Sequence, residues 1–135
     1  MSDANIDLVR RAFEDVASQG NVDVLDEIAL PDFVRHDLGG GRDIVGVEGI
    51  KKFIGAQRAV FAGLAFTIQD VVASGDKVVA SYSARGRHEG ELMGVAPTGK
   101  DVTWNGVNIY RIEDGKLAET WQLADMLGVM RQIRG

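Results

Sequence analysis

The hydrophobic periodicity of the chain changes once, near Gly63, and this change most constrains the fold. Before it, apolar residues recur every three or four positions, as on one face of an α-helix. After it, apolar and polar residues alternate, as in half-buried strands. Helices followed by a meander of strands predict an α+β fold. We expect N-terminal helices packed on a strongly curved, mostly antiparallel sheet, a cone-shaped α+β barrel whose open end is a pocket.

The pattern predicts helices in the first half, strands in the second half and a short docked helix at the end. The expected helices cover residues 5–18, 22–29, 47–62 and 125–135. The expected strands cover residues 64–73, 77–88, 101–112 and 116–124, and residues 33–36 form a brief extended piece. Glycine-rich loops are expected at residues 38–41 and 89–100, where the chain needs unusual backbone freedom.

Composition limits the class of protein and of partner. The 135 residues fit one domain, residues 1–135, without a linker. Fifteen basic and twenty acidic residues give a net charge of −5, which argues against nucleic-acid binding. No apolar run is long enough to span a bilayer, and the N-terminus lacks a secretion signal. The absence of cysteine excludes disulfides and thiolate chemistry. We therefore expect a cytoplasmic protein whose partner is a small molecule or another copy of itself.

Alternation sorts each strand into two faces, and one face of each is aromatic and apolar with a few polar members. Such a wall is typical of a pocket for an aromatic ligand, although core packing explains the aromatic residues equally well. The expected inward residues on three strands are Val78, Ala80, Tyr82, Ala84, Gly86 and His88; Val102, Trp104, Gly106, Asn108, Tyr110 and Ile112; and Leu117, Glu119, Trp121, Leu123 and Asp125. On the third helix Phe53 shares an apolar face with Gln57.

Three titratable residues are candidates for chemistry. Asp125 is in phase with an apolar face, where a buried carboxylate is costly, but an Asp before an apolar run also caps a helix. His36 and His88 each precede a glycine-rich loop, where surface residues are also common. The spacing of the two histidines and the aspartate has no metal signature, so no metal is expected.

Several motifs together are similar to a known family. They are Phe33-Val34-Arg35-His36, Arg87-His88-Glu89-Gly90-Glu91-Leu92-Met93-Gly94, Pro97-Thr98-Gly99-Lys100, residues 106–116, and the ending Glu119, Trp121, Asp125 and Met126-Leu127-Gly128. With these motifs the chain resembles the SnoaL-like polyketide cyclases, also called ester cyclases, of the nuclear-transport-factor-2-like superfamily. The resemblance covers nearly the whole chain. A superfamily with many chemistries supports the fold more strongly than the function.

The resemblance implies a homodimer or homotetramer and cofactor-free intramolecular aldol ring closure of an aromatic polyketide keto ester. Asp125 matches the acid/base of the family, and His36 and His88 match its pocket histidines. Candidate substrate-binding residues are Trp104, Asn108, Trp121, Tyr82 and Phe53. Glu119 matches a recurrent position, to which we assign a structural role. On this basis Asp125→Asn is expected to fold and to lose turnover.

Two alternatives stay open. The same scaffold could be a hydratase, an isomerase or an epoxide hydrolase, and hydrolysis would be favoured by a second pocket carboxylate paired with Asp125. Glu119 and Asp37 are the candidates for that second carboxylate. The chain could also be a non-catalytic module that binds a small molecule.

Overall fold

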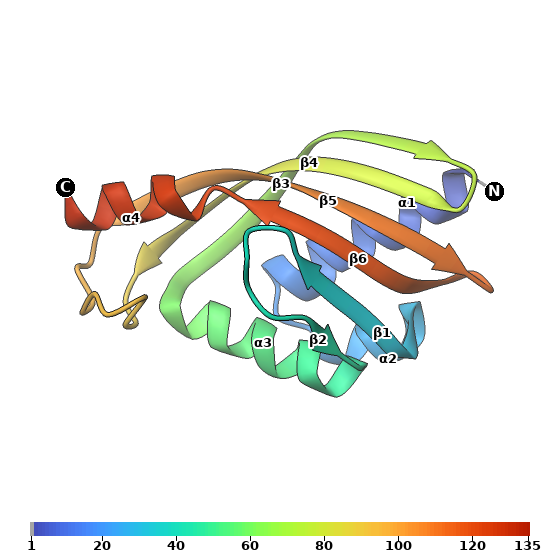
Figure 1. Cartoon of the computed structure of the whole chain (residues 1–135), viewed down its shortest axis with the longest axis horizontal. Coiled ribbons are helices and arrows are strands. Elements are labelled where there is room, and N and C mark those ends of the chain that lie inside the picture. The colour runs from blue at the N-terminus through green and yellow to red at the C-terminus, as the bar shows by residue number, and fades with distance from the viewer. Residues whose placement is uncertain (1) are drawn as a thin grey trace.

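One strongly curved sheet of six strands dominates the computed structural model, which describes residues 2–135 (Figure 1). The strand order is β2-β1-β6-β5-β4-β3. All neighbours are antiparallel except β1 and β6, which run parallel. The strands are β1 (Ala29–Asp37), β2 (Ile44–Val45), β3 (Phe61–Ser74), β4 (Lys77–His88), β5 (Asp101–Glu113) and β6 (Lys116–Ala124).

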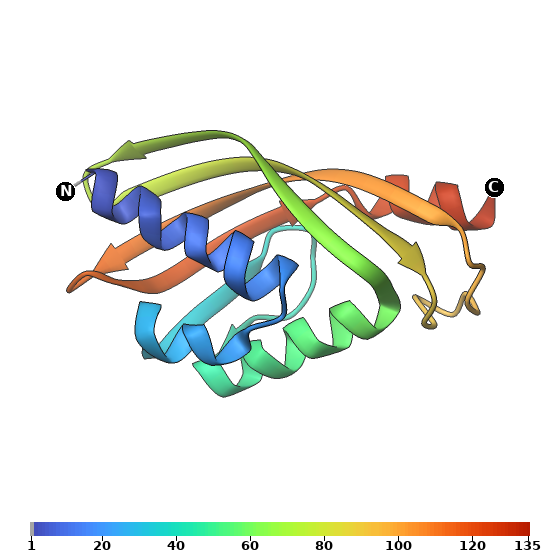
Figure 2. The same cartoon turned by 180° about the vertical axis from the view of Figure 1, so that it is seen from behind.

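The helices of the first half lie on one face of this sheet, and the last helix extends from its end (Figure 2). They are α1 (Ser2–Arg11), which continues as the π-helical segment η1 (Ala12–Ser18), the 3-10 turn η2 (Val22–Val24), α2 (Leu25–Ile28), α3 (Val47–Val60) and α4 (Met126–Arg134). The apolar face of the first helix is buried at Val9, Phe13 and Val16, which pack against the sheet. This arrangement confirms the expected α+β fold.

The expected elements agree with the structure where the pattern is local. The change of period near Gly63 is real, but β3 begins at Phe61, immediately after α3. Gly63 has a φ of +66°, which glycine adopts without strain. The helix expected over residues 22–29 is divided between η2 and α2. The brief extended piece is instead the nine-residue strand β1, because parallel pairing with β6 extends it in both directions.

The prediction of which residues of the last strand point inward is correct for Leu117 and wrong for the residues after it. Ile112 pairs with Leu117 while Arg111 pairs with Glu119, so Ala118 is an extra residue in β6. Such a β-bulge shifts the alternation by one position. Leu117 and Ala118 are therefore both buried, and Thr120 is buried after them. Glu119 and Trp121 lie on the opposite face of the strand, as does Leu123, which is 49% exposed.

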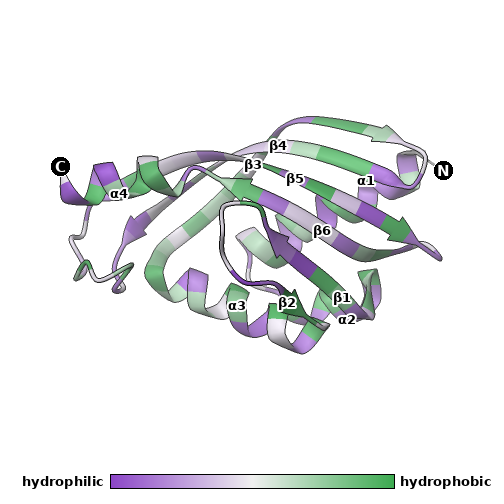
Figure 3. Cartoon of the chain, viewed as in Figure 1, coloured by the Kyte–Doolittle hydropathy of each residue, from purple (hydrophilic) through white to green (hydrophobic). Residues whose placement is uncertain are grey.

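On β5 the alternation is unbroken, and the expected inward face is confirmed. Val102, Trp104, Tyr110 and Ile112 are all buried. The banding of hydrophobic and hydrophilic residues along the strands follows this alternation (Figure 3). Within residues 2–135 no helix combines the length and the apolar character needed to cross a membrane.

Candidate functional site

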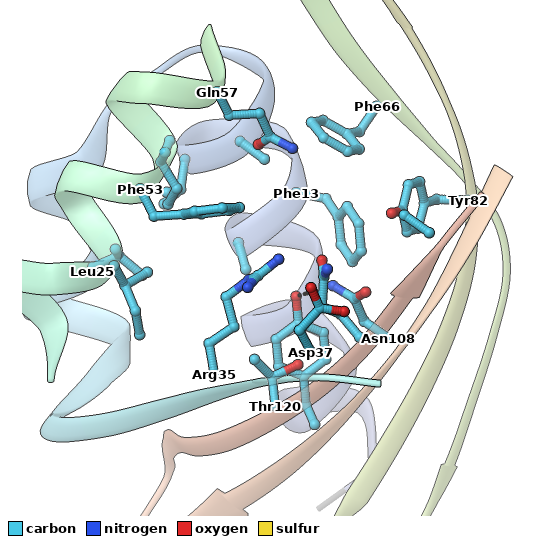
Figure 4. A pocket seen from close by; sticks show the side chains of 18 of the residues that line it. Phe13, Leu25, Arg35, Asp37, Phe53, Gln57, Phe66, Tyr82, Asn108 and Thr120 are labelled. Atoms are coloured by element: carbon cyan, nitrogen blue, oxygen red, sulfur yellow. Dashed lines mark hydrogen bonds between the residues drawn. The ribbon is translucent and has the colours of Figure 1, made fainter. Parts of the chain in front are cut away.

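A cavity of about 240 Å³ lies between the helices and the inner face of the sheet (Figure 4). Six aromatic residues line it and come from helices or strands: Phe13, Phe33, Phe53, Phe66, Tyr82 and Tyr110. The ring of Phe13 packs on three of the others, with centroids 5.3 to 6.3 Å apart. A small concave pocket with aromatic walls is the usual form of a site for a small apolar ligand.

Polar side chains enter this cavity from several elements. Strand β1 supplies Arg35 and Asp37, which point the same way because side chains two positions apart share a face of a strand. Further polar groups come from α3, β5 and β6: Gln57, Asn108, Thr120 and Gln122. The cavity thus combines an apolar wall with one cation, one carboxylate and several amide and hydroxyl groups.

Arg35 is a buried cation, with only 9% of its surface exposed. Its guanidinium carbon lies 4.0 Å from the ring centroid of Phe53, a cation–π contact. Among residues 2–135 it has neither a hydrogen-bond acceptor nor an ion-pair partner. Burial lowers its pKa, and the negative charge of Asp37 opposes that shift. An arginine stays protonated at neutral pH, so this site holds a positive charge that no side chain neutralises by contact.

Asp37 is half-buried at the end of β1, and the glycine-rich loop folds around its carboxylate. Its Oδ1 accepts a hydrogen bond of 2.8 Å from the backbone N–H of Gly39. A Cβ at Gly41 would overlap the carboxylate, so the close approach of this loop requires glycine. The loop fixes the position of Asp37 through one oxygen and leaves the other oxygen without a hydrogen bond within the described residues.

Asn108 and two tyrosines form the sheet side of the cavity. Asn108 Nδ2 donates to Tyr110 Oη at 3.1 Å, while Asn108 Oδ1 is buried and has no partner within the described chain. Burial raises the pKa of Tyr110 to about 12, so its hydroxyl stays protonated. The ring of Tyr82 lies directly over Gly106, where any Cβ would overlap it. An unpaired buried acceptor is costly unless a ligand or water supplies a donor.

Of the predicted substrate-binding residues, Phe53, Tyr82 and Asn108 line the cavity. Trp104 is buried, but it does not line the cavity. It lies behind Phe66, with centroids 6.3 Å apart, and against Phe61 at 4.9 Å.

His36 and Trp121 lie together on the outer face of the sheet. Their rings stack with centroids 5.3 Å apart. His36 Nε2 is 2.6 Å from Glu119 Oε2, and Nδ1 is 3.0 Å from Asp43 Oδ2. The hydrogen bond to Glu119 raises the pKa of His36 and lowers that of the carboxyl, and Arg111 adds to the second effect. The structural role of Glu119 stays a prediction, and its contacts with His36 and Arg111 are consistent with it.

His88 is completely buried at the end of β4 and does not line the cavity. Its Nδ1 accepts from the backbone N–H of Thr98 at 3.2 Å and lies 2.9 Å from Thr98 Oγ1. Its Nε2 has no partner among the described residues. The contacts connect the imidazole to the loop between β4 and β5.

Asp125 is the N-cap of α4, where its Oδ1 accepts from the N–H of Gly128 at 2.8 Å. The residue is exposed and does not line the cavity, although both of its neighbours, Ala124 and Met126, do. The structure therefore places the three predicted catalytic residues at three separate locations. Residues 2–135 contain no group of acidic or histidine side chains arranged to hold a metal ion.

Sequence reasoning missed the polar side of the cavity, above all Arg35, Thr120 and Gln122. A signal for Arg35 was present, because Phe33, Arg35 and Asp37 alternate along one face of an extended segment. Thr120 and Gln122 had no such signal, since the bulge at Ala118 reverses the alternation.

Comparison with known proteins identifies the family of the chain. The sequence profile of the SnoaL-like polyketide cyclases matches residues 7–133. The chain belongs to the SnoaL-like polyketide cyclase family. The nogalonic acid methyl ester cyclase of Streptomyces nogalater is 29% identical over 116 residues, which are 84% of this chain and 86% of that protein. The aklanonic acid methyl ester cyclase of Streptomyces peucetius is 29% identical over 129 residues, 95% of this chain and 89% of that protein.

A solved structure from Jannaschia sp. CCS1, assigned to the same SnoaL-like cyclases, superimposes with a TM-score of 0.90. It is 28% identical in sequence, and the match covers 98% of this chain and 92% of that one. Membership of the SnoaL-like polyketide cyclases thus rests on sequence and fold together.

Proposed function

We propose that this chain is a cofactor-independent cyclase that closes a ring in an aromatic polyketide keto ester by an intramolecular aldol reaction. The observation that carries the proposal is a cavity with aromatic walls and a few polar groups in a member of the SnoaL-like polyketide cyclases. Two similar proteins are named as cyclases of nogalonic and aklanonic acid methyl esters. The six aromatic rings of the cavity offer flat surfaces against which a fused aromatic ring system can stack.

The reaction needs three things from the protein. A base removes a proton next to a carbonyl, a positive or hydrogen-bonding group stabilises the enolate, and a proton returns to the oxygen formed on ring closure. No electrons are gained or lost, and product and substrate have the same mass. Holding the two ends of one substrate together in the cavity supplies much of the remaining rate enhancement.

The roles of Asp125, His36 and His88 stay predictions from the family resemblance. Their support is the match of residue types at these positions. Trp104 and Trp121 likewise stay predicted binding residues. Each of these five side chains lies outside the lining of the cavity, so a direct role would require the substrate to extend beyond it.

The assembly and the compartment also stay predictions. A homodimer or homotetramer is supported by apolar side chains on the sheet: Val107 is 41% exposed and Leu123 49%. A cytoplasmic location is consistent with a composition that lacks cysteine.

The hydrolytic alternative receives no support from the arrangement of carboxylates. It would be favoured by a second carboxylate paired with Asp125 in the pocket. Glu119 is on the outer face with His36, and Asp37 lines a cavity that Asp125 does not.

The direct test of the proposed function is incubation of an anthraquinone-type keto ester with purified protein, followed by chromatography and mass measurement of the product. A new species of unchanged mass, formed only with folded protein, is the expected result. Recovery of unchanged substrate, or a product heavier by one water, would contradict ring closure. An epoxide substrate in a parallel incubation tests the hydrolytic alternative.

A further inference from the structure

The buried guanidinium of Arg35 has no counter-ion in contact with it, and this is the most unusual feature of the cavity. The side chain is 9% exposed, and a charge held largely out of water without a hydrogen-bonded partner is unfavourable. The contact with the ring of Phe53 covers one face of the guanidinium, but the N–H groups of its edge remain without acceptors inside the described chain. The edge of this guanidinium is therefore available to an oxygen atom of a ligand, most favourably one that carries negative charge.

Asp37 faces the same cavity from the same strand, close enough for its charge to affect Arg35. Yet the two side chains form no ion pair, although opposite charges on one face of a strand commonly do. The hydrogen bond from the N–H of Gly39 holds one oxygen of this carboxylate at the loop. A cation and a carboxylate thus both face the cavity without direct contact between them (Figure 4).

A third group in the cavity lacks a partner. Asn108 Oδ1 is buried without a donor, and its amide is fixed by the hydrogen bond to Tyr110. The cavity therefore offers positively charged donors at Arg35 and an unfilled acceptor at Asn108. A carbonyl oxygen beside an acidic C–H, together with a hydroxyl elsewhere on the ligand, would satisfy these groups.

We infer that Arg35 and Asp37 are the catalytic pair of this cavity, with Arg35 binding the enolate oxygen of a bound ketone or ester and Asp37 transferring its proton. This inference rests on the proposed function and deepens it, because it names the groups that act and requires a substrate that can form an enolate. Asn108 Oδ1 is assigned as the acceptor for a hydroxyl group of the ligand.

The steps balance without any further reactant. The Asp37 carboxylate takes the proton next to the carbonyl, and the electron pair of that C–H bond becomes the enolate whose oxygen Arg35 binds. The enolate carbon then forms a C–C bond to the second carbonyl carbon, whose π-electron pair moves to its oxygen. The alkoxide recovers the proton from Asp37, which returns to a carboxylate. One general base and one oxyanion-binding group are each worth about 100-fold or more in rate.

The test separates proton removal from ring closure. The probe is an anthraquinone-type keto ester whose acceptor ketone is replaced by a methylene group, so that it has the acidic C–H but forms no ring. Loss of the C–H signal in deuterated buffer is followed by proton NMR, with the uncatalysed rate subtracted. Binding of the same probe is measured separately by calorimetry.

We expect wild-type protein to accelerate the exchange and Asp37→Asn to lower the rate at least about 100-fold while binding of the probe is retained. Asparagine still accepts from the N–H of Gly39, so the loop is preserved. Arg35→Lys keeps the charge but loses the planar fork, and we expect an intermediate rate. The matched control is Asp32→Asn, an exposed aspartate of β1 outside the cavity, which is expected to exchange at the wild-type rate.

The outcomes distinguish this inference from the proposed function. Exchange by wild-type protein that depends on Asp37, without ring closure of the intact keto ester, upholds the pair and overturns the cyclase. Ring closure by the wild type together with undiminished exchange in Asp37→Asn overturns the pair and leaves the cyclase intact. Binding of the probe without any exchange in wild-type protein also overturns the pair. If Asp37→Asn does not fold, a wild-type exchange rate in Arg35→Gln contradicts the assignment on its own.

Discussion

Replacement of Arg35 by methionine is expected to stabilise the fold and to slow turnover of the keto ester strongly. Methionine is an unbranched apolar side chain that can fill much of the same space. The substitution removes a cation that is 9% exposed and has no acceptor or carboxylate in contact with it among residues 2–135. A residue kept at a cost to stability is typical of a functional site.

Two opposing contributions dominate the size of the effect, and the attraction between Arg35 and the Asp37 carboxylate is smaller than the desolvation of Arg35. The cation–π contact with Phe53 is lost, which costs about 1–2 kcal/mol for a desolvated pair. The substitution also removes the desolvation penalty of the guanidinium. This penalty is several kcal/mol for a fully buried ion, and we take about 2–3 kcal/mol for Arg35 because its guanidinium borders a cavity. The net gain in the free energy of unfolding is about 1 kcal/mol, or roughly 4 °C in Tm for a domain of this size.

Thermal unfolding of wild type, Arg35→Met and Arg35→Lys, followed by circular dichroism, measures this effect. The lysine variant retains a buried charge and serves as the control, so it is not expected to gain stability. A loss of more than about 1 kcal/mol in Arg35→Met would refute the reasoning, because it would show that the fold itself uses the charge of Arg35. Turnover of the keto ester by the same variant is expected to fall at least about 100-fold.

Three further predictions concern residues outside this pair. The pairing of His36 with Glu119 stabilises the fold at pH values between the lowered pKa of the carboxyl and the raised pKa of the imidazole. When the pH rises from about 6 to about 9, the imidazole loses its proton and this stabilisation is lost. The free energy of unfolding in urea should therefore fall more for wild type than for His36→Gln. Gly106→Ala should destabilise the fold by about 1–3 kcal/mol and weaken ligand binding, because the new Cβ displaces the ring of Tyr82 into the cavity. Asp125→Ala should lose about 1 kcal/mol of stability through the missing cap of α4.

Each of these predictions has a matched control. His36→Gln should differ less from wild type at high salt, which screens the pair. Gly55→Ala, in α3 with open space around the new Cβ, should gain up to about 1 kcal/mol, and equal behaviour of the two alanine variants would contradict the steric argument. Asp125→Asn retains a capping side chain, so a stability loss as large as that of the alanine variant would remove the capping explanation.

The fold was predictable from the sequence wherever the pattern is local. The strand that carries Trp104 and Tyr110 keeps one uninterrupted period, so its buried face follows directly from spacing. Phe13 and Val16 are also buried as the spacing predicts, although they lie in the π-helical segment η1. The phase of β6 was not predictable in this way, because a single extra residue, Ala118, reverses the alternation and the sequence carries no sign of it.

The site was predictable only in part, because most of it depends on pairing between distant segments. Phe53, Tyr82 and Asn108 lie on faces that the periodicity assigns correctly, and they line the cavity. Arg35 reaches the cavity because β1 pairs in parallel with β6, and the same register puts His36 opposite Trp121 on the outer face. Long-range parallel pairing leaves little trace in the spacing of residues along one segment.

The measurement that tests the account most directly compares ring closure by Asp37→Asn and Asp125→Asn under identical conditions. Both variants are expected to fold, since asparagine retains the hydrogen bond to the loop in one and the helix cap in the other. The account predicts that the keto ester is converted to a product of unchanged mass by wild type, and at least about 100-fold more slowly by Asp37→Asn. Full activity of Asp37→Asn with loss of turnover in Asp125→Asn would contradict it and would place the acid/base at the position that the family resemblance implies.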